Sequence, residues 1–448
     1  MKKFRKGWLS PRFLVMLAPG WRRILALLLL VVSDAATAVQ LPLHAVHEVA
    51  LQAESAALLG VVHNPFLVKV TLHAVHLNST TSLSVGAFYD GNNTYRARFA
   101  CSLPGRWSWR TVGVGDAAED AGLAGQRGQV TCLAVGNSSG HGGLLVDQDH
   151  PHHFIWADGT RHFPMSYECD WIYALGLEPD STPATLESFL SSLAFGGYNQ
   201  IVMNFYANHS HWDDAPKQYL VHTVKTPWAS ADQMTLDLEY FQHYDTVLAA
   251  LQSRGIVAHI MIMVENKAVN WPTEQSPADD LYWSTIIDRY QAFDNVVWDV
   301  SKEAHNLAPS YWETRYALIE ANDSHHRLRT VHTAESKDGR THNGKAQPNF
   351  VPLEQKDCQF ISHQQHTDYH DHILRMRQLY PSKPIFNIEF LYEMGMLQTY
   401  GPQSHADEVR EVMWSVLMAG GYTNWYVSTT AWDVIVPGAF DHHCYLPR

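Results

Sequence analysis

Asn295-Val-Val-Trp-Asp-Val-Ser-Lys-Glu303 is an apolar run that ends in a carboxylate, and Lys383-Pro-Ile-Phe-Asn-Ile-Glu389 repeats this pattern later in the chain. Runs of this composition are typical of strands in a parallel sheet, which are buried on both faces. A carboxylate at such a place costs free energy unless it is paired or used. In a closed barrel of parallel strands, Glu303 and Glu389 would face one pocket at the carboxyl ends of the strands.

The chain from about residue 144 onward alternates apolar runs with amphipathic segments, which is typical of parallel α/β folds. Pro183 marks a helix start, and Gly255 and Gly420-Gly421 follow predicted helix ends. Eight strands are predicted, at residues 163–167, 200–204, 256–263, 296–300, 328–332, 360–362, 384–388 and 422–427. Eight strand–helix units over this length predict an α/β fold of the (β/α)8 TIM barrel type.

The part of the chain before the barrel has a different pattern of apolar and polar residues. Short alternating stretches at residues 41–135, such as Leu67-Val-Lys-Val-Thr-Leu72, are separated by turn signals such as Asp90-Gly91. They predict a small all-β, immunoglobulin-like sandwich, followed by a linker at residues 136–145 and the barrel at residues 146–448. Aromatic side chains of the sandwich could bind glycan, but we expect them to form its core and the sandwich to pack against the barrel.

Residues 1–38 have the features of a signal peptide: a basic flank, an apolar core at residues 24–32, and the small-residue cleavage site Ala36-Thr-Ala38. The core is shorter than the roughly 20 residues that span a bilayer, so no stable membrane span is expected. An uncleaved anchor that also uses residues 13–17 is the alternative. Cleavage would remove seven cationic residues and Asp34, which lowers the formal net charge from −13 to −19. So acidic a protein is not expected to bind nucleic acid or anionic membranes.

The acceptor sites for glycosylation and the cysteine content agree with entry into the secretory pathway. Five Asn-x-Ser/Thr acceptor sites are present, at Asn78, Asn92, Asn137, Asn208 and Asn322. Cys101 and Cys132 lie in neighbouring predicted strands and could form a disulfide, although the sequence alone leaves the connectivity open. These features predict a glycoprotein that is secreted or lies in the lumen of the secretory pathway. The sequence carries no signal for an oligomeric state.

Two groups of motifs resemble those of a family of secreted candidate glycoside hydrolases, in which an immunoglobulin-like sandwich precedes a cellulase-like barrel. The first group is Phe88-Tyr-Asp-Gly-Asn-Asn-Thr-Tyr-Arg-Ala-Arg-Phe99 with Pro104-Gly-Arg-Trp107. The second is the two runs that end in Glu303 and Glu389, together with Thr430-Ala-Trp-Asp433. The resemblance covers essentially the whole chain after residue 38. It implies a carbohydrate substrate and the retaining glycosidase clan, with the acid/base after strand four and the nucleophile after strand seven.

The chemistry of glycosidic cleavage assigns a role to each carboxylate. Glu303 would donate a proton to the leaving oxygen and then act as a base toward water. Glu389 would be ionised and attack the anomeric carbon, and like-charge coupling would separate the two pKa values. This route needs neither a metal nor another cofactor. The alternatives are a salt bridge of Glu303 with Lys302 or Arg289, and Glu393 in place of Glu389 as nucleophile.

Lys302 departs from the pattern of the clan. Much of the clan has Asn immediately before the acid/base Glu, where the amide holds the sugar 2-hydroxyl. Lys302 occupies that position here. Either another side chain makes this contact, or Lys302 recognises a different sugar, such as an anionic one.

Other polar and aromatic residues near predicted strand ends are candidates for holding the sugar. They are Asp170, Asn204, Tyr206, Trp271, Lys302, His332, His366 and Trp432. Each could instead be an ordinary core residue.

Two other classes of function stay open at this stage. The barrel could be inactive and serve as a secreted carbohydrate-binding protein, a reading that the presence of both Glu303 and Glu389 disfavours. Histidine pairs such as His209-Ser-His211 and His442-His443 could indicate a metallohydrolase. His209 and His211 lie several residues beyond strand two, so we expect solvated loop histidines and no metal.

Overall fold

The computed structural model describes residues 39–59, 63–134, 140–177, 183–207, 225–265, 269–304, 307–334, 341–342, 345–346, 358–393 and 403–426. The elements described below lie in one compact unit, Gln40–Arg448. The first strand begins one residue earlier, at Val39. The predicted signal peptide and Trp432 lie outside the described residues. Within the described residues, no helix combines the length and the apolar character needed to cross a membrane.

The first part of the unit is a small all-β fold, as the sequence predicted. Its seven strands are β1 (Val39–Pro42), β2 (Val46–Gln52), β3 (Val70–His76), β4 (Ser82–Tyr89), β5 (Thr94–Ala100), β6 (Gly105–Gly113) and β7 (Arg127–Leu133), in the sheet order β1-β7-β6-β3-β4-β5-β2. Short helices α2 (Ala56–Leu59), η1 (Pro65–Leu67) and η2 (Gly115–Ala118) connect them. Leu72, Phe99 and Trp107 are buried in the core. Cys101 and Cys132 form the disulfide that the sequence left open.

A three-stranded sheet that the sequence did not predict leads into the barrel. It comprises β8 (Leu144–Val146), β9 (Phe154–Trp156) and β10 (Arg161–His162), paired antiparallel. Leu144, Phe154 and Trp156 share a buried cluster with residues at the amino ends of the barrel strands, including Val257 and Tyr422. This sheet therefore covers the amino end of the barrel.

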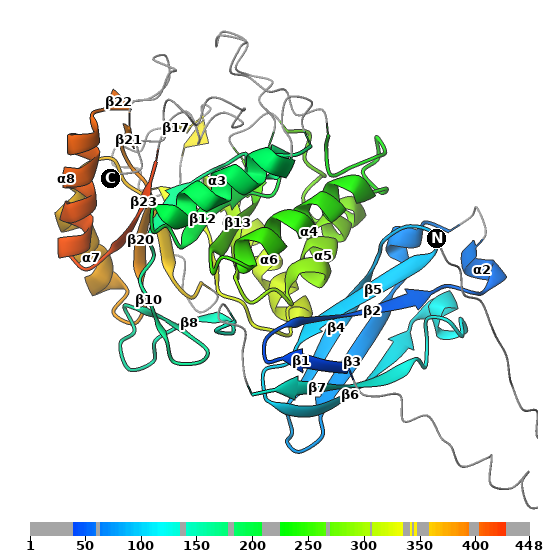
Figure 1. Ribbon diagram of the computed structural model, residues 1–448. Coiled ribbons are helices and arrows are strands. Elements are labelled where there is room, and N and C mark those ends of the chain that lie inside the picture. Colours follow the sequence, from blue (N-terminus) through cyan, green and yellow to red (C-terminus); the bar gives the residue numbers. More distant parts are fainter. Residues whose placement is uncertain are drawn as a thin grey trace, which may run out of the picture. The chain divides into compact units, whose positions relative to one another are not determined.

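The second part is a nearly closed barrel of parallel strands with helices outside it, as predicted (Figure 1). Its nine strands are β11 (Ser166–Glu168), β12 (Gln200–Asn204), β13 (Val257–Val264), β14 (Val296–Lys302), β15 (Arg329–Thr330), β16 (His332–Ala334), β19 (Ile361–Gln364), β20 (Ile385–Glu389) and β23 (Tyr422–Trp425). Only Val331 separates β15, which pairs with β14, from β16, which pairs with β19. The two segments thus act as one strand, and the eight predicted strands are all present.

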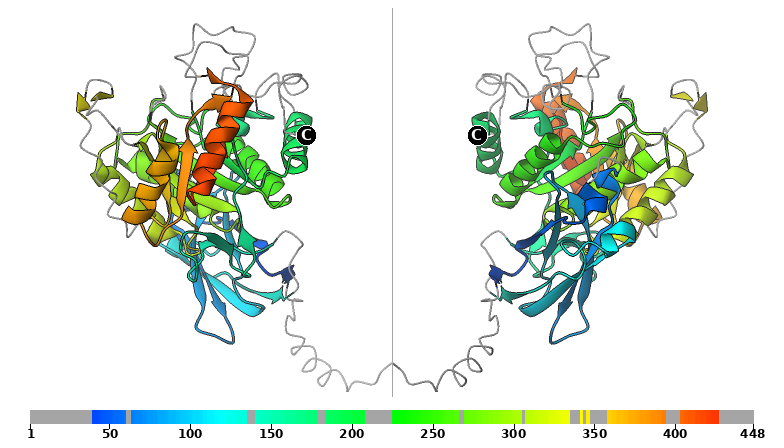
Figure 2. Two further views of the ribbon diagram at one scale, coloured as in Figure 1. Left: turned by 90° about the vertical axis from the view of Figure 1, so that its left-hand side faces the viewer. Right: turned by 90° about the vertical axis from the view of Figure 1, so that its right-hand side faces the viewer.

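Helices alternate with the barrel strands along the chain, except that the described residues include no helix between β16 and β19. Figure 2 shows the barrel from two further sides. The helices are η3 (Ile172–Ala174), α3 (Pro183–Phe195), α4 (Leu238–Gln252), α5 (Pro277–Tyr290), α6 (Pro309–Asn322), α7 (Tyr369–Leu379) and α8 (Ala406–Met418). Two small ladders, β17 (Thr341–His342) with β18 (Lys345–Ala346) and β21 (Tyr392–Glu393) with β22 (Gln403–Ser404), lie among the connecting segments. Asp237 caps α4 at its start. Gly255 adopts φ 66° beyond its end, where the sequence predicted a glycine to follow the helix.

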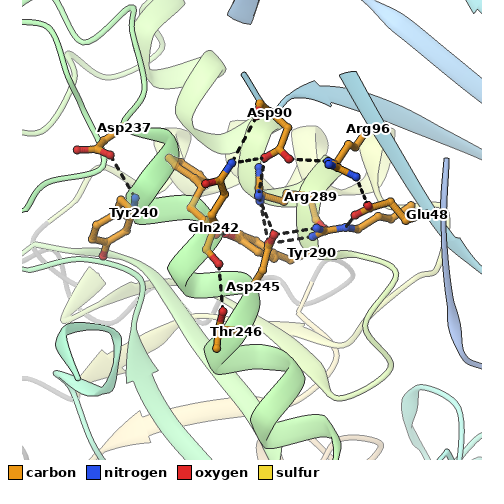
Figure 3. Close-up of polar contacts among 12 residues, drawn as sticks. Glu48, Asp90, Arg96, Asp237, Tyr240, Gln242, Asp245, Thr246, Arg289 and Tyr290 are labelled. Carbon is orange, nitrogen blue, oxygen red and sulfur yellow. Dashed lines mark hydrogen bonds and ion pairs between the residues drawn. The ribbon is translucent and has the colours of Figure 1, made fainter. Parts of the chain in front are cut away.

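A buried network of charges joins the first sheet to the barrel helices (Figure 3). Asp245 of α4 accepts hydrogen bonds from Arg98 of β5 at 2.8 and 2.9 Å, and from Arg289 of α5 at 2.7 and 2.8 Å. Arg289 also donates to Asp90 at 2.9 Å. The ring of Phe88 lies 5.0 Å from the Arg98 guanidinium and 4.5 Å from that of Arg289. The predicted packing of the first fold against the barrel thus uses residues of the Phe88–Phe99 motif.

Asp245→Asn is expected to lower the free energy of unfolding at neutral pH by about 3–5 kcal/mol, because it leaves two buried guanidinium groups without their shared carboxylate. Burial raises the pKa of Asp245, but the hydrogen bonds and charges of Arg98 and Arg289 outweigh this effect and lower it. Such a group stabilises the fold above its unfolded pKa, and this contribution is lost as pH falls through the folded pKa. Urea unfolding at neutral pH and at about pH 3 should therefore show a smaller difference at the acidic pH.

The matched control is Asp407→Asn, which removes a carboxylate from an exposed pair with Arg410 on α8. Surface pairs contribute little, so this variant should unfold like the wild type. Equal stability of Asp245→Asn and the wild type at neutral pH would contradict the role given to Asp245.

Candidate active site

Polar side chains from six strand positions meet at the carboxyl end of the barrel. Glu168 ends β11, Lys302 ends β14 and Glu389 ends β20, and all three are buried. His332 begins β16, Gln364 ends β19 and Asn424 lies in β23. Because the sheet β8–β10 covers the opposite end, chemistry is expected here.

Glu389 presents its two carboxylate oxygens differently. Oε1 accepts hydrogen bonds from Tyr392 Oη and from Gln364 Nε2, the latter at 3.1 Å. Oε2 lies 3.4 Å from Lys302 Nζ and 3.8 Å from His332 Nε2. No hydrogen bond to Oε2 is found in the described part of the chain. One oxygen is thus fixed by two donors, whereas the other lies near Lys302 and His332 without a hydrogen bond among the described residues.

The surroundings of Glu389 favour its ionised form. Burial alone would raise the pKa of its carboxyl group, since the side chain is 2% exposed. The charges of Lys302, His332 and His366 and the hydrogen bond from Tyr392 act in the opposite direction and lower the pKa to about 2. Glu389 is therefore a carboxylate over the working pH range of most enzymes.

Lys302 is also 2% exposed, and acids surround its ammonium group. Its Nζ donates to Glu168 Oε1 at 2.9 Å, to Asp170 Oδ2 at 3.1 Å and to Tyr426 Oη. Burial lowers the pKa of Lys302, but Asp170, Glu168 and Glu389 outweigh burial and raise it well above its ordinary value. The lysine is therefore charged, and the protein itself supplies its counter-ions.

Glu168 differs from Glu389 in the direction of its pKa shift. Burial raises the pKa of Glu168 well above its usual range; Lys302 opposes this shift, whereas Asp170 and Glu389 add to it. Its Oε2 accepts a hydrogen bond from Asn424 Nδ2. The two buried carboxyl groups thus have pKa values that are displaced in opposite directions.

Glu303 follows the last residue of β14 and has a left-handed backbone, with φ 51°. In a regular strand, neighbouring side chains point to opposite faces of the sheet. The left-handed backbone at Glu303 ends the strand, so this alternation does not continue from Lys302 to Glu303. Burial, Glu389, Glu303 and Glu168 together raise the pKa of the Tyr392 hydroxyl well above its ordinary value. Both candidate carboxylates thus contribute to the pKa shift of this phenol.

The two alternative partners of Glu303 are engaged elsewhere. Lys302 binds Glu168, Asp170 and Glu389, and Arg289 binds Asp245 and Asp90. The alternative of a salt bridge of Glu303 with Lys302 or Arg289 stays a prediction. The alternative nucleophile Glu393 accepts a hydrogen bond from Trp425 Nε1 at 2.8 Å.

Asn204 is fully buried at the end of β12, next to Asp170, whose carbonyl accepts its backbone N–H at 3.3 Å. Neither atom of its side-chain amide has a hydrogen-bond partner in the described structure. An unsatisfied buried amide costs free energy, so a ligand hydroxyl is a suitable partner for it.

The other sugar-binding candidates divide into two groups. His332 and His366 lie at the cluster around Glu389, and Gln364 Nε2 is 3.0 Å from His366 Nε2. Tyr206 and Trp271 lie in an aromatic cluster with Trp228 beside β12 and β13. The indole of Trp271 donates to the Val264 carbonyl at 3.2 Å. Trp432 lies outside the described residues.

Sequence reasoning missed several residues of this site. They are Glu168, Gln364, Tyr392, Asn424 and Tyr426. Glu168 could have been found, because it is an acid at the end of a predicted buried strand, like Glu389. The tyrosines carry no comparable signal, since aromatic residues are frequent throughout the chain.

Two further histidines, in the histidine-rich stretch His150-Pro-His-His153, have protein partners in the structure. His152 Nδ1 lies 3.0 Å from the Lys383 carbonyl, and His153 Nδ1 lies 2.7 Å from Tyr422 Oη. His209, His211, His442 and His443 lie outside the described residues. Among the residues that are described, no group of three His, Cys, Asp or Glu side chains is placed to hold a metal ion.

Known proteins resemble both parts of the chain. A family model described as "Apiosidase-like, catalytic domain" matches residues 152–444, and a domain of unknown function, DUF5060, matches residues 42–113. No curated protein gives a significant match. A candidate glycoside hydrolase of Bacteroides vulgatus ATCC 8482 is 20% identical, with TM-score 0.71, over 87% of this chain and 72% of that one. The likeness to this structure concerns the fold.

Two further solved structures are more distant. A glycoside hydrolase family 5 protein of the same organism is 16% identical, with TM-score 0.45, over 64% of this chain and 62% of that one. A glycoside hydrolase family 5 mannosidase of Rhizomucor miehei is 12% identical, with TM-score 0.45, over 65% and 86% of the two chains.

Proposed function

The chain belongs to the apiosidase-like family, and we propose that it is a retaining glycoside hydrolase in which Glu389 is the nucleophile and Glu303 the acid and base. The observation that carries the proposal is the asymmetry of Glu389. Two donors fix its Oε1, its Oε2 accepts no hydrogen bond among the described residues, and its pKa is lowered to about 2. A carboxylate that is ionised and oriented in this way is suited to attack an anomeric carbon.

The reaction would proceed in two displacements. Glu389 Oε2 forms a bond to the anomeric carbon while the bond from that carbon to the leaving oxygen breaks, and Glu303 gives its proton to the leaving oxygen. A water molecule then gives a proton to Glu303, and its oxygen replaces Glu389 at the anomeric carbon. Glu389 is released as a carboxylate, and Glu303 is protonated again.

The test is a screen of aryl glycosides and polysaccharides with the wild-type protein, followed by NMR of the first product formed. A retaining enzyme releases the sugar with the configuration of the substrate, so this product should have the starting anomeric configuration. Inversion, or sugar binding without any turnover, would contradict the proposal. The second outcome would favour a carbohydrate-binding protein.

Asn204→Leu is expected to lower kcat/KM by about 10–100-fold without lowering the melting temperature. The catalytic loss follows because the variant cannot hold a sugar hydroxyl, a contact that contributes on the order of 1–3 kcal/mol. Stability should be unchanged or higher, because an apolar side chain replaces a buried amide that lacks a partner in the described structure. Thermal unfolding and steady-state kinetics measure the two effects on the same sample.

Asn295→Leu is the matched control for this variant. Asn295 is a buried amide at the amino end of β14, and its Nδ2 donates to the Ile256 carbonyl at 2.9 Å. Its loss should lower the melting temperature and leave kcat/KM unchanged. A fall in stability with unchanged kcat/KM in Asn204→Leu would show that Asn204 is only a structural residue.

We further propose that the protein enters the secretory pathway and that residues 1–38 are removed. The disulfide between Cys101 and Cys132 supports this proposal, because such bonds persist in oxidising compartments. Two of the predicted glycosylation sites, Asn78 and Asn92, are exposed in turns of the first fold. Amino-terminal sequencing of protein from the culture medium, and its mobility after glycosidase treatment, test the proposal.

A further inference from the structure

The ammonium group of Lys302 lies close to four polar side chains from other strands or strand ends. They are Glu168, Asp170, Glu389 and Tyr426. We propose that Lys302 is a positioning residue that acts as the fixed counter-ion of Glu389 rather than as a ligand of the sugar. This inference rests on the proposed role of Glu389 as nucleophile. It explains why this chain has Lys302 where much of the retaining glycosidase clan has an Asn that contacts the sugar.

The hydrogen bonds of Lys302 leave its ammonium group no donor for a sugar. An ammonium has three N–H groups. Glu168 Oε1, Asp170 Oδ2 and Tyr426 Oη are each within hydrogen-bond distance of Nζ, and Glu389 Oε2 lies 3.4 Å from it. The side chain is 2% exposed. An anionic sugar would have to compete with carboxylates that are already in place.

Lys302 has a partner on both sides of the proposed covalent step. In the free protein its Nζ lies 3.4 Å from Glu389 Oε2. Attack on the sugar turns Glu389 into a neutral ester, and Lys302 then still has Asp170, whose Oδ2 lies 3.1 Å from Nζ. Lys302 can therefore hold the free carboxylate in place and remain paired after the ester has formed.

Other titratable groups lie near Glu389 or near its partners Lys302 and Tyr392, and they have to be considered in any test of pH dependence. They are Glu168 from β11, Asp170 after β11, Glu303 after β14, His332 from β16, His366 after β19, Tyr392 from β21 and Tyr426 after β23. Among the described residues, Lys302 Nζ lies closer to Glu389 Oε2 than His332 Nε2 does, at 3.4 Å against 3.8 Å.

The test compares Lys302→Met and Lys302→Gln, which remove the charge, with Lys302→Arg, which keeps it. The first readout is the acidic limb of kcat/KM against pH, on an aryl glycoside that the wild type hydrolyses, because this limb reports ionisation of the free enzyme. The limb should move to higher pH by about 1–3 units in the Met and Gln variants. Lys302→Arg should keep the limb of the wild type, even if its larger head lowers kcat.

The second readout does not need activity. Protein labelled with ¹³C at the glutamate side-chain carboxyl is titrated by NMR, and the resonance of Glu389 is identified by its loss in Glu389→Gln. Its midpoint should rise by about 1–3 units in Lys302→Met and Lys302→Gln and stay in place in Lys302→Arg. Lys225→Met is the matched control, because it removes a lysine whose partner, Glu239, lies on α4; it should shift neither readout.

Unchanged midpoints in folded Lys302→Met or Lys302→Gln, or equal shifts in all three variants, would overturn the inference. A merely structural lysine would lower stability and leave both midpoints in place. If the wild type hydrolyses no glycoside, the proposed function fails, while the NMR titration still decides whether Lys302 controls the ionisation of Glu389. The two failures are therefore distinguishable.

Discussion

Glu389→Gln is expected to abolish turnover of every glycoside that the wild type cleaves, with a loss of more than about 10⁴-fold in kcat, the range found when a covalent nucleophile is removed from other hydrolases. An amide is nearly the same size as a carboxylate but carries no charge and cannot form the glycosyl ester. The loss should be equally large for substrates with good and poor leaving groups, because both pass through the same intermediate. Steady-state kinetics on a pair of such substrates, with purified folded variant, measure it.

Glu393→Gln is the matched control, since Glu393 is the other candidate for the nucleophile and lies four residues later in the sequence. It should retain most of the activity, because its carboxylate binds the Trp425 indole. A complete loss in Glu393→Gln with an active Glu389→Gln would exchange the two assignments. Azide offers a second check: with Glu389→Ala it should attack the substrate directly and give a glycosyl azide of inverted configuration.

Glu303→Gln should show the opposite dependence on the leaving group. Removal of a general acid costs about 10²–10⁴-fold where the leaving oxygen needs a proton. A dinitrophenyl glycoside needs none, so its first displacement should proceed at nearly the wild-type rate. The covalent intermediate then accumulates because no base activates water, and a burst of dinitrophenol should be seen in stopped-flow measurements.

Azide needs no base and should restore turnover of Glu303→Gln. The product should be a glycosyl azide of retained configuration, because azide here replaces Glu389 on the covalent intermediate. An inverted azide would instead mean that Glu303 is the nucleophile. Equal losses on activated and natural substrates would contradict its role as an acid.

Much of the barrel could be predicted from the sequence, because its strands are buried on both faces and therefore consist of continuous apolar runs. The strand Gln200–Asn204 matches its prediction at both ends. Gly255, with positive φ, marks the end of α4 because glycine adopts this conformation without strain. The sheet β8–β10 was missed because its strands have only two or three residues, too few to show a period.

Only the part of the candidate site that local sequence determines could be predicted. Glu389 and Glu303 stand out because each ends an apolar run, and this argument depends on local sequence alone. The counter-ions of Lys302 are distant in sequence, and nothing near residue 302 indicates that Glu168 and Asp170 will surround it. The same holds for Arg98 and Asp245, whose contact depends on how two folds meet.

The contact of Arg98 and Arg289 with Asp245 bears on how this protein can be shortened for expression. A shortened protein that begins at β8 would lack Asp90, Arg98 and the Phe88 ring. Asp245 would then lose the guanidinium of Arg98, and Arg289 would lose its contacts with Asp90 and Phe88. Charged and apolar groups that are now covered would then be open to water on two helices. Such a fragment should aggregate, and protein engineers should treat both folds as one indivisible module.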